Sequence, residues 1–257
     1  MKLKNFVLFS LFFCLSLNAS PPHEIPTNLL NEFTNGGQIP VVHYYIDETS
    51  QSHMPFYSKD LINRLIIQAK LKQPQYYRNT DIWLFEMLDE HPNLFKEKTV
   101  AVLGSGYPWY EAVVLAYGGQ PVSIDYRKIE TNDSRLNVMT VEAYKNKPRK
   151  FDVLLSISSF EHDGLGRYGN PLDPNGDLRA MRDCFDMIYS TGKLILAVPV
   201  GQDCLVWNAH RIYGPKRLSK LLQGWEVLDY KGDYPSMFQL PSGNYYEQPV
   251  FLLQPGA

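Results

Sequence analysis

From residue 98 onward, the hydrophobic pattern of the chain alternates between two periods. Short apolar, β-branched runs of strand length recur, and stretches with helical spacing separate them. The runs that predict strands are 99–103, 121–124, 137–140, 152–156, 193–198, 225–228 and 249–253. The stretches that predict helices are 110–117, 141–145, 178–189 and 215–223. This alternation predicts an α/β fold, a three-layer αβα sandwich whose mainly parallel seven-stranded sheet has an antiparallel last strand.

The first residues have the pattern of a targeting segment. Lys2 and Lys4 precede an apolar run over 6–17, and small residues follow it. This order predicts a secretory signal peptide over residues 1–19 and a secreted or lumenal protein. Leu17 is a poor residue three positions before a cut after Ala19, so an uncleaved anchor is the alternative. A twelve-residue run is short for a membrane span, which takes about 20 residues, and no other stretch of the sequence is predicted to cross a membrane.

Residues 20–97 are predicted to be an N-terminal lead-in that contains two helices, and residues 98–257 to be the α/β domain. The segment 21–58 is rich in Pro, Asn, Gly and Ser, which predicts loose structure. Ser58 can cap a helix that runs to about residue 73, and Thr80 can cap a second helix that stops before Pro92. We expect both helices to pack against the edge of the sheet or to cover the site.

The composition and charge of the chain disfavour some classes of function. The chain has 257 residues, a net charge of -2 and a pI near 6.3, which argues against a nucleic-acid-binding surface. Cys184 and Cys204 are either two buried thiols or a disulfide, and no cysteine or histidine spacing suggests zinc. Asn132-Asp133-Ser134 is a glycosylation sequon, which matters only in the secretory pathway.

A glycine bend follows the first predicted strand of the domain. Gly104-Ser105-Gly106 lies between that strand and a helix, and the next strand ends in Asp125. Glycines let a ligand approach the backbone, and a carboxylate at a strand tip can accept hydrogen bonds from ribose hydroxyls. The alternative for Asp125 is a helix cap or a surface acid. Trp109 at the third-glycine position disfavours NAD, and no P-loop lysine follows. The remaining ligand is a nucleoside without a pyrophosphate, and S-adenosylmethionine fits.

A second group of polar residues follows the strand over 152–156. Ser158 and Ser159 are predicted to line the cofactor pocket together with the glycine bend. His162 has an ordinary pKa near 6.5 and can take a proton from an acceptor, with Asp163 orienting the ring. The alternative is that Glu161-His162 caps the next segment and braces the loop. His210 is a weaker second catalytic candidate.

Nearby side chains complete the predicted site. Tyr107 and Tyr126 are expected to pack on an adenine or to line its pocket, and ordinary core packing is the alternative. Arg167 or Tyr168 is expected to hold an anionic or carbonyl group of the acceptor.

In their order and spacing, these motifs resemble the class I S-adenosylmethionine-dependent methyltransferase superfamily from about residue 98 to 253. Within it, the chain is similar to an uncharacterised family known as a domain of unknown function. The resemblance implies a Rossmann-like fold and a cofactor pocket lined by Gly104, Ser105, Gly106, Asp125 and the region of Ser158 and Ser159. The superfamily usually has an acid two residues before the first glycine, near the methionine amino group, and this chain has Val102 there. Pro108 also replaces the third small residue of the turn.

Two main hypotheses follow. The first is a methyltransferase that uses S-adenosylmethionine and acts on a small-molecule or glycan-like acceptor. The second is a non-catalytic protein of the secretory pathway that keeps the fold as a binding or structural module. An oxidoreductase or sugar-nucleotide enzyme is a weaker third option, because Trp109 stands at the third-glycine position.

Overall fold

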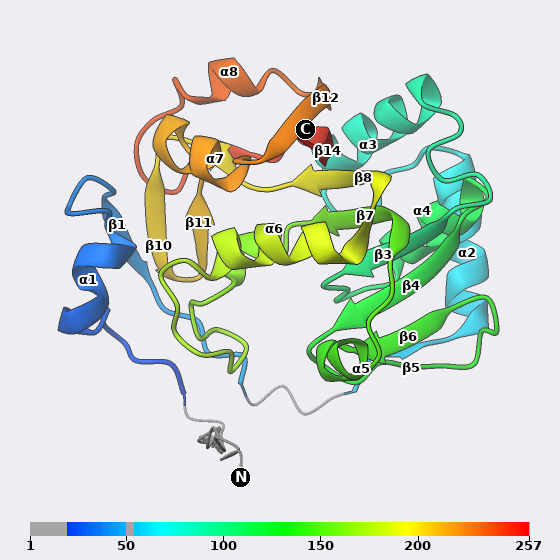
Figure 1. Ribbon diagram of the computed structural model, residues 1–257, viewed down its shortest axis with the longest axis horizontal. Helices are drawn as coiled ribbons and strands as arrows, with labels where there is room; N and C mark the ends of the chain where they lie inside the picture. Colours follow the sequence, from blue (N-terminus) through cyan, green and yellow to red (C-terminus); the bar gives the residue numbers. More distant parts are fainter. Residues whose placement is uncertain (1–19, 50–53, 257) are drawn as a thin grey trace, which may run out of the picture.

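The computed structural model describes residues 20–49 and 54–256, so the predicted signal peptide lies outside the described residues (Figure 1). Its main sheet has seven strands in the order β12-β14-β8-β7-β3-β4-β6. The last strand, β14, is antiparallel to both of its neighbours, and the other neighbouring pairs are parallel. The strands are β12 (Trp225–Lys231), β14 (Val250–Pro255), β8 (Ile188–Ala197), β7 (Phe151–Ile157), β3 (Thr99–Leu103), β4 (Gln120–Asp125) and β6 (Asn137–Thr140). The predicted α/β sandwich is confirmed.

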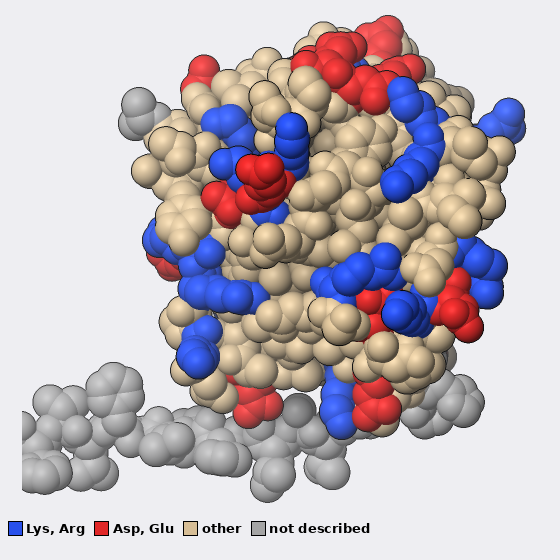
Figure 2. Space-filling model, turned by 90° about the vertical axis from the view of Figure 1, so that its right-hand side faces the viewer, with Lys and Arg blue, Asp and Glu red and all other residues tan. Residues whose placement is uncertain are grey.

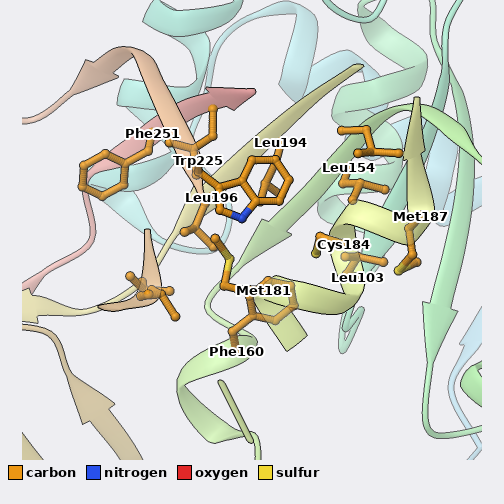
Figure 3. Packing of buried hydrophobic residues seen from close by; sticks show 14 of the residues in the cluster. Leu103, Leu154, Phe160, Met181, Cys184, Met187, Leu194, Leu196, Trp225 and Phe251 are labelled. Atoms are coloured by element: carbon orange, nitrogen blue, oxygen red, sulfur yellow. The ribbon is translucent and has the colours of Figure 1, made fainter. Parts of the chain in front are cut away.

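Helices cover both faces of this sheet because its strands bury side chains on both sides. One face packs on α2 (Lys59–Lys70), α3 (Arg78–Glu90) and α4 (Trp109–Ala116). The other packs on α5 (Val141–Asn146), α6 (Gly176–Met187) and α7 (Pro215–Leu221). Figure 3 shows Met181, Cys184 and Met187 of α6 beside sheet residues such as Leu154. Along β3, Val100 and Val102 face the first layer, whereas Ala101 and Leu103 face the second.

The two lead-in helices form part of the sandwich. Helix α2 packs on α4, and α3 packs on β12 and β14. Helix α3 therefore lies at the edge of the sheet formed by β12 and β14, as expected, and Tyr76 and Tyr77 just before it line the cavity described below, whereas α2 covers a face of the sheet through α4. Ser58 caps α2 as predicted, accepting a hydrogen bond from the Leu61 N–H at 3.2 Å. Thr80 does not cap α3, because that helix begins two residues earlier and the Thr80 hydroxyl donates to the Gln248 carbonyl.

The segment before residue 58 is more ordered than the sequence predicted. It contains α1 (Thr27–Phe33) and β1 (Val41–Tyr44), and β1 joins β10 (Cys204–Asn208) and β11 (His210–Ile212) in a second sheet. Figure 1 shows these early and late segments side by side. The Trp207 indole is buried against Phe33 and donates to the His23 carbonyl at 3.1 Å. This burial, which local sequence does not reveal, orders the segment.

Short elements complete the chain between these layers. They are β2 (Phe56–Tyr57), β5 (Glu130–Thr131), η1 (Phe160–His162), β9 (Val200–Gly201), α8 (Tyr234–Met237) and β13 (Tyr246–Glu247). Cys184 and Cys204 are free and buried, so of the two predicted options, two buried thiols or a disulfide, the structure has the thiols.

Acidic and basic side chains are interspersed on the face seen in Figure 2. Among the helices in the described ranges, none is long and apolar enough to cross a membrane.

Candidate functional site

A cavity of about 710 Å³ lies at the carboxyl ends of β3, β4 and β7. All of the predicted site residues line it, from both the cofactor side and the acceptor side. These are Gly104, Ser105, Gly106, Tyr107, Asp125, Tyr126, Ser158, Ser159, His162, Asp163 and His210. Trp109 does not fill the cavity, since its side chain is fully buried in the core against Phe85. The residues predicted from the sequence therefore line one cavity, and this cavity is open.

The glycine bend requires glycine at its first position. Gly104 has a φ of +73°, and a Cβ there would lie 2.2 Å from Ser159 Oγ. The end of β7 thus packs directly on the bend. On its other side, the buried Tyr57 hydroxyl donates to the Ser105 carbonyl at 2.6 Å. These contacts hold the bend in one conformation and exclude any side chain from Gly104.

Asp125 points toward the glycine bend. One carboxylate oxygen accepts the Ser105 N–H at 3.0 Å, and the other accepts the Arg127 N–H at 2.8 Å. The Arg127 guanidinium also contacts both oxygens, at 3.2 Å through Nε and 3.4 Å through Nη2. Backbone donors therefore take half of the acceptor positions of this carboxylate, and Arg127 takes the rest. Arg127 was not predicted as a site residue, although the Asp-x-Arg spacing is a local signal.

Tyrosines form much of the cavity wall, which the sequence analysis recognised only at Tyr107, Tyr126 and Tyr168. The seven that line it are Tyr76, Tyr77, Tyr107, Tyr110, Tyr126, Tyr168 and Tyr246. Tyr76 stacks on Tyr107 with ring centroids 6.0 Å apart. Aromatic faces of this kind suit flat rings and cationic groups.

The buried carboxylate of Asp81, on α3, holds this wall in place. It accepts the Gln75 and Tyr76 N–H groups at 2.9 Å each and the Tyr110 hydroxyl at 3.1 Å. The sequence gives no indication of this role, because the helical pattern alone does not show where Asp81 points.

Ser158 and Glu161 form a polar pair where β7 ends. Ser158 has a φ of +52°, a left-handed conformation that is uncommon outside glycine and costs about 1–3 kcal/mol. Its hydroxyl donates to Glu161 Oε1 at 2.6 Å. Glu161 is fully buried, and burial raises the pKa of its carboxyl group to about 7. Glu161 was predicted only as a residue that braces the loop.

His162 has a defined tautomer. Its Nδ1 lies 2.7 Å from the Ala209 carbonyl, which can only accept, so Nδ1 carries the hydrogen and Nε2 is the acceptor. The expectation that Asp163 orients the ring is corrected, because the carbonyl of Ala209 does so. Burial, followed by the positive charge of Arg167, lowers the pKa of His162 to about 3. The ring is therefore neutral and weakly basic, whereas its proposed proton removal presumed a pKa near 6.5.

The loop around His162 rests on buried charges. The Arg217 guanidinium pairs with Asp177, and the Tyr213 hydroxyl donates to the same carboxylate at 3.0 Å. Arg211 also faces Asp177, and its Nη1 donates to the Asp163 carbonyl at 2.6 Å. Although burial opposes ionisation, these guanidinium groups lower the pKa of Asp177. Arg211 thus braces the loop from behind.

Other polar side chains line the acceptor side of the cavity. The His210 ring lies 3.0 Å from the Asn244 amide oxygen. Arg167 pairs with Glu48 at 2.8 Å, so an anionic acceptor group would share this guanidinium with a carboxylate.

Val102 is a buried core residue, and no acid takes its position directly. Glu111 is fully buried on α4, where its Oε1 accepts the Ser123 hydroxyl at 2.7 Å, and it does not line the cavity. An acid that serves a methionine amino group in this cavity would therefore have to come from the end of another strand.

Comparisons with solved structures show which fold this is. A 1,6-didemethyltoxoflavin-N1-methyltransferase from Burkholderia thailandensis, solved with 1,6-didemethyltoxoflavin and S-adenosylhomocysteine, is similar to this chain with a TM-score of 0.50. The identity is 14%, over 75% of this chain and 79% of that chain. An S-adenosylmethionine-dependent methyltransferase from Clostridium acetobutylicum has 12% identity and a TM-score of 0.47, over 76% of this chain and 98% of that one. The likeness to the first of these structures, together with the mostly parallel seven-stranded sheet, shows a methyltransferase-like Rossmann fold.

Residues 97–254, more than half of the chain, match the family described as Caenorhabditis protein of unknown function, DUF268. The chain belongs to this family. No curated protein matches the sequence.

Proposed function

We propose that this chain is a methyltransferase that transfers a methyl group from S-adenosylmethionine to a small-molecule acceptor. The observation that carries the proposal is the open cavity that joins the glycine bend, the Asp125 carboxylate and a polar acceptor side. When bound, S-adenosylmethionine supplies an electrophilic methyl group on a sulfonium sulfur. The task of the protein is then to hold donor and acceptor in line, which provides most of the acceleration.

The residues present fit such a donor. Gly104 leaves the backbone accessible, and the Asp125 oxygens can accept two ribose hydroxyls once the Arg127 side chain moves aside. Tyr107 and Tyr126 are partly exposed in the cavity and offer ring faces to an adenine.

On the acceptor side, His162 offers the unprotonated Nε2 and His210 a second imidazole. With the hydroxyls of Tyr168 and Tyr246, these groups suit an uncharged acceptor rich in hydroxyl groups, of small-molecule or glycan-like kind. His162 would accept a hydrogen bond from the acceptor hydroxyl and so orient its oxygen.

Titration calorimetry with S-adenosylhomocysteine tests the proposal. We expect binding to the wild type and at least tenfold weaker binding to Asp125→Asn, which loses a charged acceptor. Asp133 is a matched control, because it holds Arg135 through the same Asp-x-Arg arrangement outside the cavity. Asp133→Asn should bind like the wild type. No binding to the wild type at millimolar ligand would contradict the proposal.

A second candidate function, a non-catalytic binding or structural module, is favoured by one observation. The Arg127 guanidinium takes the Asp125 lone pairs that ribose hydroxyls would need. Arg127→Met separates the candidates. A methyltransferase binds S-adenosylhomocysteine with Arg127 present and more tightly without it. In a non-catalytic module, Arg127 keeps the pocket closed, so S-adenosylhomocysteine binds only to the Arg127→Met variant.

We further propose that the protein enters the secretory pathway and is secreted or lumenal, or stays anchored by an uncleaved N-terminal segment. The support is the order of charged, apolar and small residues over 1–19.

A further inference from the structure

Glu161 is a buried carboxyl group in the cavity wall that forms no ion pair with a Lys or Arg of the described residues, although the charge of Arg167 acts on it from a distance. Its Oε2 has no hydrogen-bond partner among the described residues either. The two arginines that line the cavity pair with other acids, Arg127 with Asp125 and Arg167 with Glu48. His162 Nε2 lies 3.6 Å from Glu161 Oε1, but that ring is neutral. A buried carboxylate without a counterion is costly, so this position favours a ligand that brings positive charge.

Ser158 and Gln248 present further acceptors around Glu161. The Ser158 hydroxyl gives its hydrogen to Glu161 Oε1, accepts the Gln248 Nε2–H at 3.4 Å and also interacts with the Tyr77 hydroxyl, so a ligand that binds Ser158 Oγ would take the place of the long contact with Gln248. Gln248 is 6% exposed, and its Oε1 has no partner within the described chain. We call Ser158, Glu161 and Gln248 the Ser158 cluster. It offers acceptors backed by a carboxyl group, which is the complement of an ammonium group.

The surroundings of the Ser158 cluster favour the same ligand. The ring of Tyr246 also lines the cavity, and burial, followed by the charge of Glu161, raises the pKa of its hydroxyl. Aromatic faces near a cation add a favourable electrostatic contact. The cluster also abuts the cofactor side, because the Ser159 hydroxyl is packed directly on Gly104.

We propose that Ser158, Glu161 and Gln248 bind the ammonium group at the amino-acid end of the methyl donor. This inference rests on the proposed function. Ser158 Oγ and Gln248 Oε1 accept the ammonium hydrogens, and Glu161, buried behind Ser158, is a positioning residue that supplies the negative charge. The cluster thus provides from β7 the acidic character that Val102 does not provide from β3.

Two ligands that differ at one end test the inference. S-adenosylhomocysteine carries the ammonium group, whereas 5′-methylthioadenosine has the same nucleoside and lacks the amino-acid end. Titration calorimetry on Glu161→Gln should show at least tenfold weaker binding of S-adenosylhomocysteine and less than twofold change for 5′-methylthioadenosine. Ser158→Ala, which removes an acceptor, should show the same selective loss and replaces Glu161→Gln if that variant fails to fold.

Glu111→Gln is the comparison variant, because Glu111 is also a fully buried acid and lies outside the cavity, where its side chain supports Ser105 of the glycine bend. Since both ligands carry the nucleoside that the bend would hold, any change in affinity should be equal for the two ligands. Unchanged binding of S-adenosylhomocysteine to Glu161→Gln, or an equal loss of both ligands, would overturn the inference while the proposed function stands. A wild type that binds neither ligand would overturn both.

Discussion

At the scale of single residues, the Glu161 carboxyl group links the cavity to stability. Its pKa rises from 4.5 in the unfolded chain to about 7 in the fold, chiefly through burial. Below pH 4.5 both states hold the proton. Between pH 4.5 and 7 the unfolded chain releases it while the fold retains it, so the free energy of unfolding falls as pH rises. Above pH 7 the loss is complete, and it amounts to about 3 kcal/mol.

Glu161→Gln removes this titration, so we expect the variant to gain stability relative to the wild type as pH rises. The difference in unfolding free energy should grow by about 3 kcal/mol between pH 4.5 and pH 8. Urea denaturation of both proteins at these pH values measures it. Asp163 and His162 titrate in both proteins and largely cancel in the difference. A difference that does not change with pH would contradict the burial of an unpaired Glu161 carboxyl group.

At the scale of elements, Asp81 ties the start of α3 to the tyrosine wall. Asp81→Ala leaves the Gln75 and Tyr76 N–H groups and the Tyr110 hydroxyl without their acceptor. We expect a loss of about 3 kcal/mol in unfolding free energy and faster proteolysis near residues 74–77. Urea denaturation and limited proteolysis check this.

Asp89 is the control on the same helix, because its exposed carboxylate pairs with Lys72 at the surface. Asp89→Ala should change stability by less than about 1 kcal/mol. Equal losses for the two variants would contradict the role assigned to Asp81.

The elements also show what the sequence could predict. The strands and helices after residue 98 have strong local periods, and the glycine bend and Asp125 are adjacent to strand ends, so pattern and topology sufficed for both. Strand β1 was missed because its four residues are stabilised by β10, which is more than 150 residues away in the chain. Gln248 escaped notice for the same reason, since only the pairing of β14 with β8 brings it beside Ser158.

At the scale of the whole molecule, one surface feature bears on where the protein folds. Asn132, in the sequon, is exposed between β5 and β6 and does not line the cavity. Its Oδ1 accepts the Lys59 N–H at 2.7 Å, which leaves the amide nitrogen, the atom that carries a glycan, outside that bond. The two cysteines that follow the predicted signal peptide are free and buried, so an oxidising compartment would not cross-link this fold through them.

When the full chain is expressed in a eukaryotic secretory host, we therefore expect a glycan on Asn132. The measurement is a mobility shift that peptide N-glycosidase removes, with the site assigned by mass spectrometry of the peptide. Ser134→Ala is the sharper control than a change of Asn132, because it destroys the sequon and keeps the hydrogen bond to Lys59. The variant should enter the same compartment without the shift. Wild-type protein that enters the secretory pathway without a glycan would contradict the accessibility of Asn132. Retention in the cytosol would instead contradict the proposed route, because the sequon can be modified only after the chain has crossed into the lumen.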